Sequence, residues 1–228
     1  NAWDLPLGTA AIRPGTVLAA VDYFTITVKG RSSHAAQPHR GLDPLPCAVQ
    51  IYGALQNLVS RRMDPHDTVV LSIGMFHAGT SQIVIPETVT MSGTIRTLKP
   101  ATRKAMDELF HQTVNGLCAA HGVELILDYK RSYPPTINTA EEASAFEAAA
   151  RDVVGDDLIK TDLPSLTAGE DFAYYLEKAP GAFMLLGQVT ETHKAVPVHN
   201  GHYDFNDELL PIGASCFARL VEQQLSGV

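Results

Sequence analysis

Apolar and polar side chains alternate, and then recur at helical spacing, along the first part of the chain. Residues 23–28 alternate in the manner of a half-buried strand, and this run ends at Gly30. A stretch with apolar residues three and four positions apart follows Asp43-Pro44, a pair typical of a helix N-terminus. The pattern therefore predicts a strand followed by an amphipathic helix.

The same two periods return further along the chain. Residues 68–76 and 88–97 are strand-like. Residues 100–121 carry an apolar helical stripe that stops at Gly122, and residues 123–129 alternate again. The predicted order is β-α-β-β-α-β, the ferredoxin-like arrangement of a four-stranded antiparallel sheet with two helices on one face.

The rest of the chain predicts helices with a single convincing strand. Helices are expected at 140–154, 170–178 and 208–225, and a buried strand is expected at 181–187. A lone strand cannot satisfy its own backbone hydrogen bonds, so we expect partner strands from a preceding segment. Residues 1–15 are Pro- and Gly-bearing and look loop-like, and there is no initiator Met. We therefore expect a fragment of a larger protein, although processing also removes Met.

Composition narrows the classes of function. The 228 residues are 45% hydrophobic, which is ample for a core, and the net charge of −8 argues against binding to nucleic acid or an anionic membrane. No apolar run approaches the roughly 20 residues that span a membrane, and no secretory signal opens the chain. Cys47, Cys118 and Cys216 fall in apolar helical patterns, which indicates buried free thiols of a cytoplasmic protein.

The segment 198–207 concentrates metal-binding chemistry. It places His199 and His202 beside the carboxylates of Asp204 and Asp207, and neutral imidazole is a common ligand of zinc-like metals. One histidine is a candidate ligand, while the other packs or caps, and the acidic residues shape the loop. A catalytic metal needs about three protein ligands, and nothing else in the chain completes such a set.

Two further side chains have both a functional and an ordinary interpretation. His34 lies in a small-residue loop after a strand, where an imidazole can donate to a developing oxyanion. Arg96, at a strand end, can bind a substrate carboxylate with two hydrogen bonds. From the residues alone, a surface histidine and a surface arginine are the simpler interpretations. No motif for a serine or cysteine nucleophile is present.

Short motifs distributed over nearly the whole chain resemble the dinuclear-metal aminoacylase/carboxypeptidase family, in its hippurate hydrolase and indole-acetyl-amino-acid hydrolase branch. They follow the family's order: Asn1 to Gly8, Ala19 to Asp22, Ser33 to His39, Asp43-Pro44, Val84 to Pro86, Gly93 to Thr97, Gly169 to Phe172, and His199 to Asp207.

The resemblance implies a ferredoxin-like lid, residues 22–137, inserted in an α/β zinc-peptidase-like catalytic domain that here is partial. Residues 1–21 would end the N-terminal part of that domain, and residues 138–228 would form its C-terminal part. The lid would also make a homodimer. Two divalent ions (zinc, manganese or cobalt) would activate a water, and most of their ligands would precede this chain, so the fragment alone would be inactive.

The resemblance also implies roles for single residues. His199 would be the C-terminal metal ligand, His34 would steady the oxyanion in the partner subunit's site, and Arg96 would hold the substrate carboxylate. The reaction would be hydrolysis of an N-acyl amino acid, such as a hippurate, to a carboxylate and a free amino acid. The chain departs from the family at Ile83, where Asn is usual, and at Ser32-Ser33, where Gly-Gly is usual and where we expect the change to stiffen the loop.

A different class of function is also open. The ferredoxin-like part is complete, whereas the metal set is not. A non-catalytic dimerisation or binding module built on that part is therefore the alternative.

Overall fold

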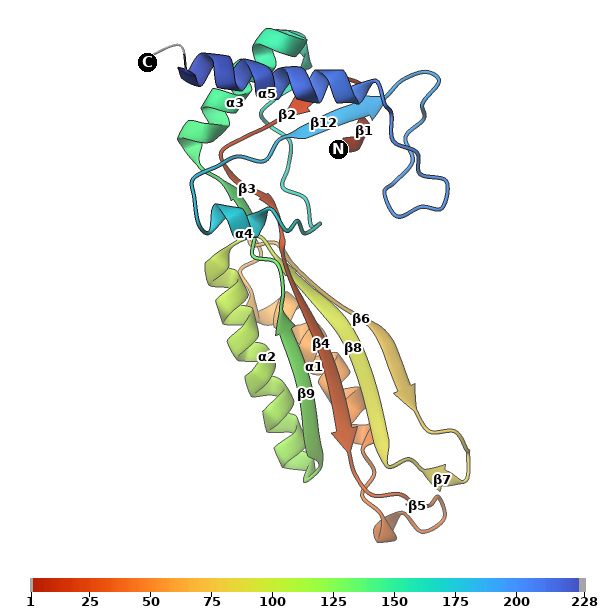
Figure 1. The fold of residues 1–228 in the computed structure, drawn as a ribbon. Coiled ribbons are helices and arrows are strands. Elements are labelled where there is room, and N and C mark those ends of the chain that lie inside the picture. Colours follow the sequence, from red (N-terminus) through yellow and green to blue (C-terminus); the bar gives the residue numbers. More distant parts are fainter. Residues whose placement is uncertain (1, 226–228) are drawn as a thin grey trace. The chain divides into compact units, whose positions relative to one another are not determined.

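The computed structural model describes residues 2–225, apart from the side chain of Trp3. Contacts divide the chain into two compact units (Figure 1). The first unit consists of Asn1–Val17, Thr136–Leu166 and Asp171–Val228, and the second of Leu18–Pro135 and Thr167–Glu170. The fold is mixed α/β.

The second unit contains a four-stranded antiparallel sheet in the order β6-β8-β4-β9. Its strands are β4 (Ala20–Lys29), β6 (Val69–Ala78), β8 (Thr88–Thr97) and β9 (Glu124–Arg131). Its helices are α1 (Leu45–Arg62) and α2 (Pro100–His121) (Figure 1). The order along the chain is β-α-β-β-α-β, as the periodicity predicts.

Alternation along β4 explains how the second unit forms its core. Phe24, Ile26 and Val28 are buried on one face of the sheet and share one apolar cluster with residues of both helices. The Asp43 carboxylate accepts the Leu45 N–H at 2.9 Å at the start of α1. Helix α2 begins at Pro100 and ends before Gly122, whose φ of +68° suits a residue without a side chain.

A buried carboxylate ties β4 to its neighbours. Asp22 is 2% exposed and accepts hydrogen bonds from the Arg103 guanidinium and, at 3.2 Å, from the Tyr129 hydroxyl. Arg103 also donates to the Ser132 carbonyl at 3.2 Å. Burial, together with the Asp22 charge, raises the pKa of Tyr129. One buried charge thus links β4, α2 and the end of β9.

The three cysteines are free and buried, as predicted. In the second unit, the Sγ atoms of Cys47 on α1 and Cys118 on α2 lie 3.9 Å apart in the core. Burial raises the pKa of all three thiols, and that of Cys118 to about 12. Because the thiolate is the reactive form, these side chains act as apolar core residues.

The first unit has a smaller sheet in the order β1-β12-β2-β11. Its strands are β1 (Ala2–Pro6), β2 (Ala10–Ala11), β11 (Ile159–Lys160) and β12 (Leu185–Val189). Strands β3 (Gly15–Leu18) and β10 (Thr136–Asn138) form a separate pair. The helices are α3 (Ala140–Val154), α4 (Ala173–Leu176) and α5 (Leu209–Leu225), and α3 packs against α5 (Figure 1).

Three expectations for the first unit need correction. The opening residues are not a loop, because β1, β2 and β3 lie there and β1 pairs in parallel with β12. The helix expected at 170–178 covers only Ala173–Leu176. Residues 171 and 172 still accept turn hydrogen bonds, from the Tyr174 and Tyr175 N–H groups at 3.0 Å each, but the helix itself begins at Ala173.

The strand expected at 181–187 is Leu185–Val189. The residues before it are held by the end of β10, through the Asn138 side chain and through the Thr139 N–H, which donates to the Gly181 carbonyl at 3.0 Å. The Asn138 amide donates to the Phe183 carbonyl at 2.9 Å, and its oxygen accepts the Phe183 N–H at 2.7 Å. Within residues 2–225, no helix is both long and apolar enough to cross a membrane.

Replacement of Asp22 should destabilise the second unit. We expect Asp22→Ala to lower the free energy of unfolding by about 3–5 kcal/mol, because it leaves the largely buried Arg103 guanidinium without its counter-charge. Asp128→Ala, at an exposed position on β9, should change it by less than about 0.5 kcal/mol. Urea unfolding measures both, and equal effects would contradict the importance of the Asp22 contacts.

Candidate functional site

His199 lies in the loop between β12 and α5. This loop is attached to the end of β12 through Gln188, whose side chain is buried. The Asn206 amide donates to the Gln188 carbonyl at 2.9 Å, and the Tyr203 hydroxyl donates to the Gln188 side-chain oxygen at 3.4 Å. The His193 ring, at Nε2, lies 2.9 Å from the Asp204 carbonyl and joins the two halves of the loop.

The backbone at His199 has an unusual conformation. Its φ is +68°, and within residues 2–225 it is the one non-glycine residue with positive φ. The next residues form a tight turn in which the Asn200 side chain accepts the His202 N–H at 2.9 Å, and the imidazole of His199 is exposed. Such a conformation is costly for a residue with a side chain, and it concentrates at functional positions.

The described donors do not make a metal site by themselves. Among residues 2–225, no group of three or more His, Cys, Asp or Glu side chains is arranged to hold an ion. His202, Asp204 and Asp207 accompany His199 in sequence but do not complete a set with it. The described side chains therefore do not by themselves fit a catalytic metal, which needs about three protein ligands.

His34 lies in the second unit on a short strand that pairs with the loop before β8. Strands β5 (Ser33–His34) and β7 (Val84–Ile85) are antiparallel, with His34 opposite Val84. The Ala35 N–H donates to the Ile83 carbonyl at 2.9 Å, which extends the pairing by one residue. The ladder holds the exposed residue His34 beside the loop of residues 79–83 that precedes β7.

The predicted stiffening at Ser32-Ser33 has a specific source. The Ser32 hydroxyl donates to the Ile85 carbonyl at 2.9 Å, so this side chain adds a bond between the two segments that glycine cannot make. Gly41 allows the loop to fold back, because a Cβ there would lie 2.5 Å from the Ser33 Oγ atom. The His34 loop is held from both sides.

A backbone contact sets the tautomer of His34. The Ala36 N–H donates to Nδ1 of His34 at 3.1 Å. Nδ1 is therefore the acceptor nitrogen, and neutral imidazole carries its proton on Nε2. The Nε2–H group of His34 is therefore available to donate a hydrogen bond to a bound molecule.

Arg96 lies far from His34 within the second unit. It stands near the end of β8, opposite Val21 of β4 and Val70 of β6, and its side chain is half-buried. The β5–β7 pair precedes the other end of β8, which begins at Thr88 (Figure 1). Eight residues of strand separate Thr88 from Arg96, about 27 Å. One copy of this unit therefore does not bring the two side chains together.

The anchors of the His199 loop were only partly predictable. The Asn206 side chain accepts the Glu208 N–H at 3.1 Å in the turn just before α5, a bond that short polar side chains commonly make. Its second role, donation to Gln188, was missed. The available signal was Gln188 itself, an amide that follows the apolar run Leu185-Leu186-Gly187.

The positive φ of His199 predicts an unusual order of stability. We expect His199→Gly to be more stable than His199→Ala by about 1 kcal/mol, because alanine retains the steric cost of the left-handed conformation. At His202, which lacks positive φ, the order should reverse. Thermal unfolding of the four variants measures this, and the same order at both positions would contradict a constrained His199.

Comparison with known proteins shows where the chain belongs. It is 32% identical over 97% of its length to IAA-amino acid hydrolase ILR1-like 2 of Arabidopsis thaliana, and 31% over 97% to hippurate hydrolase of Campylobacter jejuni. It is 34% identical over 96% of its length to N-acetylcysteine deacetylase of Bacillus subtilis. It covers 51%, 58% and 56% of those proteins respectively, so the chain spans about half the length of the curated relatives it matches.

A solved structure gives the same assignment. The Bacillus subtilis YXEP protein, a dinuclear metal binding peptidase from the M20 family, superposes with a TM-score of 0.78 at 29% identity. That match covers all of this chain and 56% of the other. The model of peptidase family M20/M25/M40 matches residues 4–223, and the chain therefore belongs to that family.

Proposed function

We propose that this chain is the lid and the C-terminal part of an amidohydrolase that cleaves N-acyl amino acids to a carboxylate and a free amino acid. The observation that carries the proposal is the family match over residues 4–223, with relatives that act on hippurate, IAA-amino acids and N-acetylcysteine. In this proposal residues 22–137 are the ferredoxin-like lid, which is inserted between residues 1–21 and 138–228 of the catalytic domain.

His34 would stabilise the oxyanion that forms when the amide carbonyl is attacked. Its Nε2–H is an available donor because Nδ1 accepts the Ala36 N–H. Arg96 would bind the substrate carboxylate, since within residues 2–225 its guanidinium has no ion pair that competes for it. Both roles use groups that the fold positions in the second unit.

His199 would be one ligand in the complete enzyme, which we propose binds two divalent ions such as zinc, manganese or cobalt. The described residues do not supply the other ligands. They would come from polypeptide outside this chain, and the isolated chain would be inactive.

A homodimer through the second unit would resolve the separation of His34 and Arg96. In a dimer, His34 of one subunit and Arg96 of the other can serve the same site.

Strand β6 is an end strand of its sheet, and exposed apolar side chains lie on it and on α1. Met75 is 54% exposed, and Phe76 makes an edge-to-face contact with Tyr52 at 6.4 Å. An open apolar strand edge favours pairing with a second copy.

A non-catalytic dimerisation or binding module is the second candidate. It is favoured by the completeness of the antiparallel sheet and by the lack of a metal-binding group within the described residues. The two candidates differ in what a longer protein containing this chain would do.

The amidohydrolase proposal predicts how metal content and activity depend on single residues. A longer protein that includes this chain and the remaining family length should hydrolyse N-benzoylglycine only with divalent metal bound. His199→Ala should lower the metal content, whereas His202→Ala should retain it. His34→Ala should retain the metal and lower kcat by about 100-fold or more. Elemental analysis and steady-state kinetics measure these effects.

The amidohydrolase proposal would be rejected if the longer protein showed no metal-dependent amide hydrolysis and its His199→Ala variant also kept a normal metal content. The isolated chain provides the reference, and it should retain close to no metal after incubation with Mn²⁺ or Zn²⁺ and desalting.

The proposed homodimer predicts the oligomeric state of the chain. The chain should dimerise in sedimentation experiments, and Tyr52→Lys with Met75→Lys should raise the dissociation constant at least tenfold by placing charge at the β6 face. Ile126→Lys is the matched control, because Ile126 is 51% exposed on β9 at the opposite end of the sheet. A monomeric wild-type chain, or an equal effect of Ile126→Lys, would contradict dimerisation through β6.

A further inference from the structure

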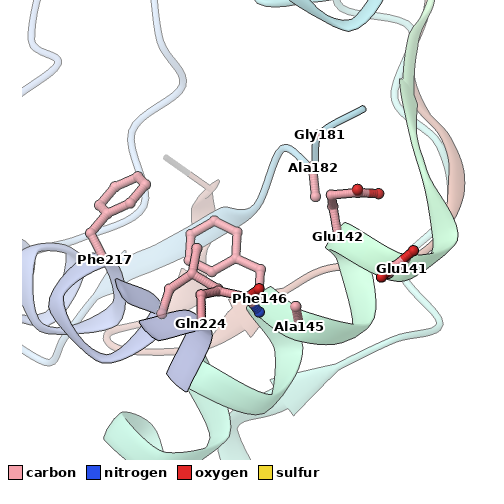
Figure 2. Close-up of a pocket in the computed structure, with 9 residues that line it drawn as sticks. Glu141, Glu142, Ala145, Phe146, Gly181, Ala182, Phe217 and Gln224 are labelled. Atoms are coloured by element: carbon pink, nitrogen blue, oxygen red, sulfur yellow. The ribbon is translucent and has the colours of Figure 1, made fainter. Parts of the chain in front are cut away.

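The hollow beside α3 offers apolar surface and no metal site. It has a volume of about 330 Å³ and opens between α3 and α5, where the Phe146 and Phe217 rings are 5.3 Å apart (Figure 2). Figure 2 shows the side chains of Glu141 and Glu142 at one end of it. Among residues 2–225, these carboxylates belong to no group of three metal donors. The reactive group of the first unit lies elsewhere, in the exposed pair Asn200-Gly201.

The chain contains the dipeptide Asn-Gly twice, in two different conformations. Asn115-Gly116 lies inside α2, and Asn200-Gly201 lies in the loop before α5. In this dipeptide the backbone nitrogen of glycine can attack the side-chain amide carbon of the preceding asparagine, because no Cβ hinders its approach. The sequence therefore offers two sites for the same reaction, and the local fold determines which of them reacts.

The helix protects Asn115. Its side-chain amide donates to the His111 carbonyl at 2.7 Å, which directs the amide toward the preceding turn and away from Gly116. Inside a helix, each N–H donates to the carbonyl four residues earlier. The Gly116 nitrogen must give up that bond before it can attack, so α2 has to open first.

Asn200 has the opposite surroundings. Its side-chain oxygen accepts the His202 N–H at 2.9 Å, which folds the amide forward along the chain and makes its carbon more electrophilic. The Tyr203 N–H donates to the Asn200 carbonyl at 3.0 Å and closes a tight turn around Gly201. Among the hydrogen bonds of residues 2–225, none is donated by the Gly201 N–H. The nucleophile and the amide carbon are therefore held in one turn that is open to water.

From these contacts we infer that Asn200 is a self-modification site of the folded chain, and that Asn115 is not. The Gly201 nitrogen loses its proton to a base in the solvent and forms a bond to Cγ of Asn200. The side-chain nitrogen takes up a proton and leaves as ammonia, which produces a cyclic succinimide. Water then opens either of the two ring C–N bonds and leaves aspartate or isoaspartate. Only water and base are consumed, and the reaction is independent of the proposed function.

Both products change the turn that follows His199. Each places a negative charge one residue from the imidazole, and isoaspartate adds a methylene group to the backbone. His199 already has the costly φ of +68°, so its position depends on the turn beside it. The effect on metal binding rests on the proposed function, in which His199 is a ligand. There, metal content should fall as isoaspartate accumulates.

The test compares the two Asn-Gly pairs within one molecule. The chain is incubated in mildly alkaline buffer, and mass spectrometry of its peptides follows the conversion of each amide to an acid. We expect Asn200 to react at least about tenfold faster than Asn115 in the folded chain, because the helix must open at Asn115. In urea the two rates should converge, since unfolding leaves the same dipeptide at both sites.

Gly201→Ala is the matched control. It should slow the reaction at Asn200 by about tenfold or more, because a Cβ hinders the attack. Alanine fits the turn, since the φ of Gly201 is not positive and no atom lies within 4 Å of the position that its Cβ would take. In the longer protein, this variant should keep its metal during an incubation in which the unsubstituted protein loses metal.

Three results would overturn the inference. These are equal rates at Asn115 and Asn200 in the folded chain, an Asn200 that reacts only in urea, and a Gly201→Ala variant that reacts as fast as the unsubstituted chain. Neither metal nor substrate enters this assay, so its outcome is distinct from that of the proposed function. Equal metal loss with and without Gly201→Ala would reject only the effect on His199.

Discussion

Strand β4 is hydrogen-bonded along both sides, and this double pairing determines where the functional candidates of the second unit lie. Its pairing with β8 runs without a shift from Ala20 opposite Thr97 to Lys29 opposite Thr88. A slip of one residue would move every buried side chain to the other face, so the apolar core keeps the register fixed. The loop with His34 leaves one end of this frame, and Arg96 stays at the other. Their separation is therefore a property of the fold and not of a flexible loop.

The elements of the second unit were predictable because each has a strong local pattern. Residues 100–121 form the predicted helix with the predicted stop at Gly122, and residues 88–97 form the predicted strand. The first unit was harder for a physical reason. The pairing that stabilises β1 comes from β12, far along the chain, and Ala10-Ala11 is too short for any period to be visible. Non-local hydrogen bonds define those strands, and sequence periodicity carries no information about them.

The candidate site likewise combines features that the sequence predicts with features that depend on the fold. The resemblance to the family, and not residue type alone, selected His34, Arg96 and His199 as candidates, and their roles stay predictions. Neither could indicate that the Ala36 N–H binds Nδ1 of His34, or that His199 has positive φ, because both depend on backbone conformation. The role of Gln188 as the anchor of the His199 loop depends on contacts with Tyr203 and Asn206, which are brought to it by the fold of the loop.

The two units differ in how much of their apolar surface is covered by their own residues. In the second unit, β4 has partners on both sides and the two helices share one buried cluster with the sheet. In the first unit, α5 buries Cys216 but exposes Phe217, the next residue, and Val221, about one turn beyond Phe217. Apolar area left in water contributes nothing to stability, whereas the same area packed against a partner contributes in proportion to what is removed from water. In the first unit, which carries His199, the exposed side of α5 therefore adds to stability only where a partner removes it from water.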